Sequence, residues 1–199
     1  MKHIYMPSIK TNKAELIELL PEFSKDVFDF ASNEQVAKTV IWDAHQSVHD
    51  SIQYIERVRK KLSYSEGAIF LCWAVREKES KKVIGLVSLT ELAPIRAQIG
   101  YVFHYGHWNT NLPVECIQSV TQFAFQEFGS FERLQCRCFP TNPSSINLLE
   151  RVGFQFEGVN HAMVKVRGQL QDLACFAMTR KRWAVLGDAR PENDVSDHS

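Results

Sequence analysis

An asparagine and two serines stand close together in the stretch TNPSSINLLERVGF, residues 141–154. Apolar residues recur behind them at helical spacing, so the stretch predicts a short helix at 144–152 that begins at Ser144 or Ser145. From residue types alone, Asn142 can be a loop residue that bonds its own backbone, and Ser145 can be a plain helix cap. The same polar groups can instead hold a substrate at the start of the helix.

The loop GHWNTNLPVEC, residues 106–116, follows an expected strand and precedes an expected helix. At such a junction, the free backbone N–H groups and the helix dipole favour a bound phosphate. Phosphate loops usually carry glycine, because the backbone must come close to the anion. Here no glycine follows Gly106, and the loop has a tryptophan, two asparagines, a threonine and a proline instead. The loop is therefore a candidate phosphate site with unusual residues.

The composition argues against several other functions. The 199 residues include 23 Lys and Arg and 23 Asp and Glu, a zero formal charge that disfavours DNA or an anionic membrane as partner. No apolar run approaches the roughly 20 residues that span a bilayer. An odd number of cysteines, five, and the lack of a signal peptide predict a cytoplasmic protein. His104, His107 and His161 are not spaced with further ligands, so no metal site is expected.

Hydrophobic periodicity predicts the elements that must position these candidates. β-Branched and aromatic runs predict strands within 2–11 and at 68–75, 82–89, 97–105, 134–139, 154–166 and 171–179. Helical spacing predicts helices at 13–30 with a break at Pro21, and at 47–64, 113–128 and 144–152. Ser47 and Asp50 form a helix start signal, while Gly129 and Gly153 are expected to end helices.

This order of elements predicts one α/β (α+β) domain with a mixed sheet over residues 1–184. The strands at 68–75 and 82–89 flank a short polar turn, so they are expected to pair antiparallel. Residues 185–199 are polar, acidic and interrupted by proline, which is typical of a disordered tail.

The pattern N-P-S-S-I-N-L-L-E-R-V-G-F-x-x-E-G, residues 142–158, closely resembles the signature of the GNAT superfamily of N-acetyltransferases. Further matches follow in the family's order at VIGLVSL, AQIGYVF, the helix that carries Glu115, and LQDLACFAMTRKRW. The resemblance extends over about residues 3–184 and is nearest to the branch that acetylates ribosomal-protein N-termini. It implies the GNAT fold, a mostly antiparallel mixed sheet of about seven strands, splayed between the strands at 97–105 and 134–139 and flanked by helices.

The resemblance implies that acetyl-CoA is the co-substrate and lies between those two strands. Its pantetheine arm would pair with the strand backbone around Val102 and Phe103, as an added strand would. Asn142 would hold the arm from the other side. Ser145 matches the family's catalytic position next to the departing CoA thiolate, where a weakly acidic hydroxyl hydrogen-bonds the sulfur more readily than it transfers a proton.

The resemblance places the residues that bind the CoA pyrophosphate at Trp108, Asn109, Thr110, Asn111 and Leu112. Asparagine tolerates positive φ better than other residues with side chains, so Asn109 and Asn111 are expected to keep the curl of the loop. The cost relative to glycine is about 1 kcal/mol. Pro113 removes an amide donor, and a lost charge-assisted bond costs about 1.5–3 kcal/mol. We therefore expect a working but weakened cradle.

Gln98 stands where many relatives have a glutamate, just before the I/L-G-Y of the central strand. A glutamine side chain can hydrogen-bond an amine but cannot take its proton. Glu91 is the nearest alternative carboxylate in sequence, although a solvated strand end is its simpler role. Gln98 and Glu91 are thus candidates for substrate binding, and the general base is left open.

The implied reaction is direct transfer of acetyl from acetyl-CoA to a primary amine, without an acyl-enzyme. The acceptor can be a peptide N-terminus, including that of a ribosomal protein, or a small molecule, and the protein can be a monomer or a homodimer. A second class of function is a degenerate GNAT-fold module that binds or regulates with weakened or lost acetyl-CoA binding. The loop and Gln98 favour the module, whereas Asn142 and Ser145 favour the enzyme.

Overall fold

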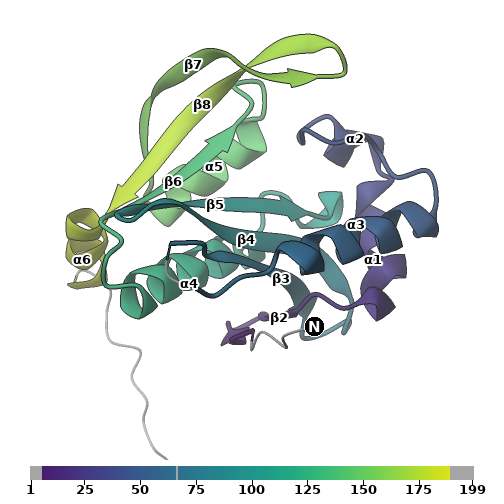
Figure 1. Ribbon diagram of the computed structural model, residues 1–199, viewed down its shortest axis with the longest axis horizontal. Coiled ribbons are helices and arrows are strands. Elements are labelled where there is room, and N and C mark those ends of the chain that lie inside the picture. The colour runs from purple at the N-terminus through teal and green to yellow at the C-terminus, as the bar shows by residue number, and fades with distance from the viewer. Residues whose placement is uncertain (1–5, 66, 189–199) are drawn as a thin grey trace, which may run out of the picture.

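A computed structural model of the protein describes residues 6–65 and 67–188 and contains one eight-stranded sheet (Figure 1). The strand order across the sheet is β1-β2-β3-β4-β5-β6-β8-β7. The strands are β1 (Ile9–Lys10), β2 (Ala14–Glu18), β3 (Phe70–Glu77), β4 (Val83–Ala93), β5 (Arg96–Phe103), β6 (Arg133–Cys138), β7 (Gln155–Val166) and β8 (Gln169–Thr179). The helices are α1 (Ser24–Ala31), α2 (Glu34–Ala37), α3 (Val48–Lys61), α4 (Asn111–Glu127), α5 (Pro143–Val152) and α6 (Arg180–Asp188), with 3₁₀ turns η1 (Pro21–Phe23) and η2 (Tyr105–His107).

Helices cover both faces of the sheet, and each face has its own hydrophobic core. Helices α4 and α5 belong to one core, and α1 and α3 belong to the other. Successive strand residues point to opposite faces, so Trp73 on β3 enters the first core and Ala74 enters the second. Val87 and Leu86 divide in the same way on β4. Near-continuous apolar strands are what a sheet buried on both faces requires.

The sheet opens between β5 and β6, which form its parallel pair. Their pairing covers Arg96–Gln98 and Arg133–Gln135 and then stops, although both strands continue. The other neighbouring strands pair antiparallel. The predicted mixed sheet with a splay between these strands is confirmed. Beyond Gln98, the edge of β5 that faces β6 has no strand partner among the described residues.

The prediction of a helix across 13–30 was wrong for its first part. Residues Ala14–Glu18 form β2, which pairs antiparallel with β3 and with β1 and raises the strand count from about seven to eight. The side chains of Ala14 and Leu16 are fully buried and share one face, which is the two-residue period of a strand. Pairing with β3 outweighs the local helical preference of this segment. After Pro21, α1 forms as expected.

Two of the predicted helix ends are confirmed and two are corrected. Ser47 and Asp50 form a reciprocal capping box at α3, and Gly153 ends α5 with φ of 104°. The N-cap of α5 is Asn142, so neither Ser144 nor Ser145 has that role. Helix α4 ends at Glu127 with an extended residue at its C-cap, so the expected left-handed glycine does not occur at Gly129.

The described chain ends in α6, which continues through Asp188. Residues 185–188, expected in the tail, are therefore helical, and residues 189–199 lie outside the described residues. Trp183 of α6 packs against Phe125 of α4, with ring centroids 5.3 Å apart. Among the described helices, none has the length and apolar character needed to cross a membrane.

Candidate functional site

A narrow cleft of about 90 Å³ lies where β5 and β6 diverge, next to the start of α5. We call it the α5 cleft. It is lined by β5, the loop that follows β5, β6 and the first turn of α5. The predicted site residues that it brings together are Val102, Phe103, Trp108, Asn109, Thr110, Asn142 and Ser145.

Asn142 and Ser145 are positioned by the first turn of α5. The side-chain oxygen of Asn142 accepts a hydrogen bond from the backbone N–H of Ser145 at 3.1 Å, which caps the helix. This leaves the amide nitrogen of the Asn142 side chain, a double donor, without a hydrogen-bond partner among the described residues. Asn142 thus combines the two roles that the sequence left open, because it caps α5 and still presents donors at the cleft.

The hydroxyl of Ser145 is 2.6 Å from the hydroxyl of Tyr101 on β5. Ser145 is only 8% exposed and Tyr101 is half-buried, so this pair has limited contact with solvent. Burial raises the pKa of Tyr101 well above its usual value near 10, because a phenolate would be poorly solvated there. The Tyr101 hydroxyl therefore keeps its proton at neutral pH and can donate it in a hydrogen bond.

Sequence reasoning did not select Tyr101 as a site residue. The signal was its position in the AQIGYVF run, on the strand expected to bind the pantetheine arm. A tyrosine in a strand is usually explained by packing alone, because its ring fills a half-buried surface well. Its pairing with Ser145 joins residues 44 positions apart and depends on the placement of α5 against β5.

The loop between β5 and α4 differs in part from the expectation. Asn109 has φ of 61°, so it does adopt the left-handed conformation that glycine usually provides. Asn111 does not, because it is the first residue of α4, and its side chain accepts a hydrogen bond from Arg151 of α5. The indole N–H of Trp108 donates to the carbonyl of Phe103 at 3.0 Å and holds the loop against β5.

Three backbone N–H groups at the start of α4 are available to a ligand. The amides of Asn109, Asn111 and Leu112 make no hydrogen bond to any of the residues that the structure describes. Thr110 is the N-cap, but its hydroxyl donates to the carbonyl of His107 and caps none of these amides. Leu112 contributes its backbone only, since its side chain is 4% exposed in the core. Pro113 lines the cleft in the first turn and has no N–H to offer.

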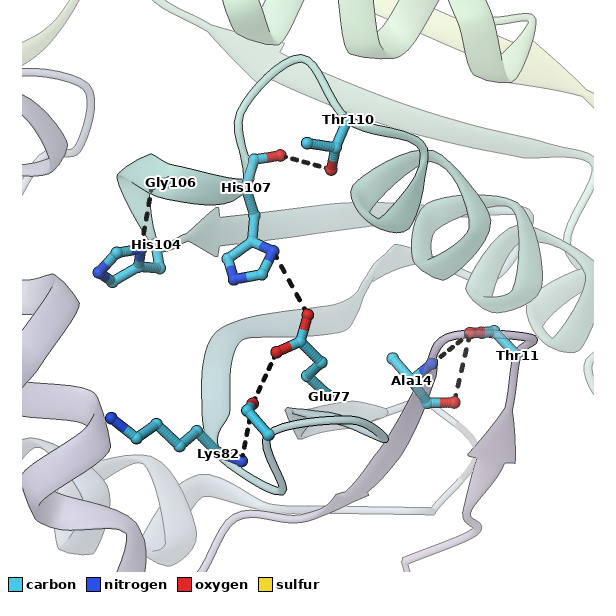
Figure 2. A network of polar contacts seen from close by, with 9 residues as sticks. Thr11, Ala14, Glu77, Lys82, His104, Gly106, His107 and Thr110 are labelled. Carbon is cyan, nitrogen blue, oxygen red and sulfur yellow. Dashed lines mark hydrogen bonds and ion pairs between the residues drawn. The ribbon is translucent and has the colours of Figure 1, made fainter.

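Figure 2 shows the polar contacts behind this loop, which tie it to the β3–β4 hairpin. His104 accepts a hydrogen bond from the backbone of Gly106 at 3.0 Å, and Thr110 bonds the carbonyl of His107 at 2.8 Å. The imidazole of His107 lies 3.8 Å from the carboxylate of Glu77. His104 and His107 thus support the loop, and the residues described contain no cluster of ligands that could hold a metal ion.

A larger cavity of about 430 Å³ lies on the opposite side of the sheet, between β5, β6 and α3. We call it the α3 cavity. Tyr101, Val102, Arg137 and Cys138 line both this cavity and the α5 cleft, so the two meet at the splay. Gln98 also lines the α3 cavity, where its side chain accepts a hydrogen bond from Gln135 at 3.4 Å.

The structure does not bring Glu91 to either space. Its carboxylate accepts a hydrogen bond from the backbone N–H of Ile69 at 3.2 Å, near the end of β4. Glu91 pairs in register with Ala97, whose side chain faces the α4 core, whereas Gln98 lines the α3 cavity. In the part of the chain that the structure describes, no Asp or Glu lines the α5 cleft or the α3 cavity.

Cys138 is the thiol at the junction of the two spaces, and it is 7% exposed. Burial raises its pKa, because the thiolate would be poorly solvated. A thiol that stays protonated at neutral pH is a weak nucleophile. All five cysteines are free, and four of them are buried.

A family model described as "Acetyltransferase (GNAT) domain" matches residues 16–155. The chain belongs to the GNAT acetyltransferase family. It is thus an N-acetyltransferase of the GNAT type, as the asparagine–serine start of α5 and the splayed sheet indicated. The chain is 25% identical over 178 residues to "Uncharacterized N-acetyltransferase YoaA" of Bacillus subtilis (strain 168), which covers 88% of this chain and 98% of that protein.

Solved structures of other GNAT proteins share the fold. A GCN5-related N-acetyltransferase from Brucella melitensis superimposes with a TM-score of 0.80 at 22% identity, covering 96% of this chain and 88% of that one. The microcin C7 self-immunity acetyltransferase MccE, solved in complex with acetyl-CoA and AMP, has a TM-score of 0.71 at 20% identity, covering 85% of this chain and 93% of that one. At these identities the likeness concerns the fold.

Proposed function

We propose that the α5 cleft binds acetyl-CoA, that the α3 cavity binds a primary amine, and that acetyl passes directly between them. The observation that carries this proposal is the meeting of the two spaces at Tyr101, whose hydroxyl pairs with Ser145. A donor and an acceptor held on opposite sides of one opening can react with little motion, which is how an enzyme gains from proximity.

The α5 cleft offers acetyl-CoA three kinds of contact. The unpaired edge of β5 around Val102 and Phe103 can pair with the pantetheine arm in the manner of an added strand. The side-chain amide of Asn142 donates from the opposite side of the cleft. The three free amides between Asn109 and Leu112, at the start of the 17-residue helix α4, suit the pyrophosphate.

The chemistry requires a neutral amine and a stabilised leaving group. The amine nitrogen forms a bond to the acetyl carbon while the bond from that carbon to sulfur breaks. Ser145 hydrogen-bonds the departing thiolate, while the Tyr101 hydroxyl keeps its proton and can donate a hydrogen bond to Ser145, so CoA leaves as the thiolate. The amine releases its own proton to water. No lining carboxylate is needed, because an α-amino group with a pKa near 8 is about one-tenth neutral at pH 7.

The alternative is a GNAT-fold module that binds a ligand without transfer, and Pro113 and Gln98 are the features that favour it. Calorimetric titration of acetyl-CoA into the protein, followed by an assay for CoA release with primary amines, separates the two. Binding in the micromolar range with amine-dependent release of CoA supports the enzyme. No binding at millimolar acetyl-CoA would overturn the proposal, and binding without transfer to any amine would favour the module.

Ser145→Ala is the matched control for this experiment. The substitution removes the side-chain hydroxyl but keeps the backbone N–H of residue 145, which donates to the side-chain oxygen of Asn142. We expect acetyl-CoA binding to persist and transfer to slow, because Ser145 acts on the leaving group. A variant that loses binding and transfer together would mean that the hydroxyl serves the structure of the cleft rather than the reaction.

A further inference from the structure

The α3 cavity has mainly apolar and aromatic walls. Trp42 and Tyr54 stand on one side, with ring centroids 6.2 Å apart, and Phe70 and Phe139 are further lining residues. A volume of about 430 Å³ is within the ordinary range for small-molecule sites. Such walls stabilise an apolar group of aromatic size and would leave a polyamine chain poorly solvated.

Arg137 is the one cationic side chain among the residues that line the α3 cavity. It is partly buried, and its guanidinium makes no hydrogen bond or ion pair with any described residue. No Asp or Glu of the described chain lines the cavity to balance it. A guanidinium in mainly apolar surroundings gains most from an anion that it can bind through two parallel hydrogen bonds.

The position of Arg137 also limits how far this anion lies from the reacting amine. Arg137 precedes Cys138 on β6, and both line the junction where the amine must meet the acetyl group. Arg137 lines both spaces, so its side chain itself reaches this junction. The amine and the anion of the acceptor are therefore close together in the same small molecule.

We propose that the acceptor is a free α-amino acid with an apolar or aromatic side chain, whose carboxylate binds Arg137. This inference rests on the proposed function, since it assigns the amine substrate of the same site. The α-amino acid supplies the amine and the carboxylate two bonds apart, and its side chain occupies the aromatic walls beside Trp42 and Tyr54. A peptide N-terminus has an amide in place of that carboxylate and so lacks the charge.

A contact between two of its lining segments partly covers the α3 cavity, which agrees with a small acceptor. Arg167, in the turn between β7 and β8, bonds the carbonyls of Ala37 and Trp42 at 2.9 Å and pairs with Asp43 at 3.0 Å. Figure 1 shows the β7–β8 hairpin reaching across toward α2. The hairpin and the segment after α2 both line the cavity, so their contact bridges its outer side.

The test compares phenylalanine, phenylalaninamide, 2-phenylethylamine and a short peptide that begins with phenylalanine. These acceptors share the ring and the primary amine and differ in the carboxylate, and because the pKa of the amine also differs among them, each kcat/KM is divided by the fraction of that amine that is neutral. With saturating acetyl-CoA, CoA release and the mass of the N-acetyl product give kcat/KM for each. We expect phenylalanine to exceed the others by about tenfold or more, the worth of one charge-assisted pair. Equal values, or a preference for the peptide, would overturn the inference.

Arg137→Gln tests the assigned contact, and Arg96→Gln is its control, because Arg96 is an exposed arginine at the far end of β5. Arg137→Gln should lower kcat/KM for phenylalanine about tenfold and leave that for 2-phenylethylamine unchanged, while Arg96→Gln changes neither. Equal losses for all acceptors would contradict the inference. If acetyl-CoA binds but phenylalanine is not acetylated, the inference is wrong and acetyl-CoA binding stands; if acetyl-CoA does not bind, the proposed function itself fails.

Discussion

The α5 cleft and the α3 cavity meet at the same opening, but they are built in different ways. The α5 cleft takes most of its polar groups from two short runs, the loop at 108–113 and the first turn of α5. The α3 cavity is assembled from most of the sheet, α3 and the segment after α2. The first is narrow and mixes polar with apolar groups, and the second is wider and mainly apolar. A binding site formed by consecutive residues can be predicted from a sequence, whereas a site assembled from distant elements cannot.

The largest expected effect lies at the junction of the two spaces. Tyr101→Phe and Ser145→Ala each remove one hydroxyl of the buried pair and should lower kcat by about 10²–10³, because the leaving thiolate loses its donor. Steady-state kinetics with saturating acetyl-CoA and phenylalanine gives the values. The double variant should cost little more than the worse single variant, since the two hydroxyls act as one unit. Fully additive losses would show that they act separately.

The next effect distinguishes the α5 cleft from the α3 cavity. Pro113 lines the α5 cleft, so Pro113→Ala restores an N–H there in the first turn of α4 and should tighten acetyl-CoA binding by about ten- to a hundredfold. Calorimetry measures the affinity, and the KM of the amine serves as the internal control, because the α3 cavity is unchanged. Tighter binding of both substrates would contradict the separation of the two spaces.

The asparagines of the loop provide a matched pair for the same measurement. Asn109→Gly should leave acetyl-CoA affinity unchanged within about twofold, because the cost of about 1 kcal/mol for positive φ at Asn109 belongs to the folded loop and is the same before and after binding. Asn111→Gly should weaken binding, since Asn111 is helical and bonded to Arg151. A loss at Asn111 with no change at Asn109 is the expected result. Equal gains would mean that both asparagines substitute for glycine, as the sequence alone predicted.

For the α3 cavity, Arg167→Ala tests whether the contact between the β7–β8 hairpin and the segment after α2 supports acceptor binding. The substitution removes the bonds to Ala37, Trp42 and Asp43, and we expect the KM of the acceptor to rise about three- to tenfold. Acetyl-CoA affinity should stay the same, because Arg167 does not line the α5 cleft. An equal loss of affinity for both substrates would indicate general unfolding, which thermal denaturation would reveal.

The difference between the two spaces also explains what could be predicted from sequence. Local signals predicted the capping box at Ser47 and the left-handed Gly153, because each depends on a few neighbouring residues. The strand at Ala14–Glu18 could not be predicted locally, since its pairing with β3 decides it. The contacts of Arg167 join residues 124–130 positions apart and carry no signal in a pattern of this length.

The smallest effect concerns acid pH and the wall of the α3 cavity. His45 packs 5.3 Å from Trp42 and lies 2.8 Å from the hydroxyl of Ser51. Burial lowers the pKa of His45, and Arg57 lowers it further, while Asp50 raises it. The unfolded chain therefore binds a proton on this histidine at a higher pH than the folded chain does. Above about pH 6.5, His45 is neutral in both states and does not change the free energy of unfolding. As the pH falls through that value, protonation of His45 in the unfolded chain lowers the free energy of unfolding.

We therefore expect the KM of phenylalanine to rise by about two- to threefold more between pH 7.5 and 5.5 in the wild type than in His45→Gln. The comparison between the two proteins cancels the protonation of the amine itself, which is the same in both. Acetyl-CoA affinity should show no such difference, because His45 lies beside the α3 cavity and away from the α5 cleft. Parallel KM profiles for the two proteins would mean that the wall beside Trp42 tolerates a charged imidazole, and that the acid sensitivity of the acceptor site arises elsewhere.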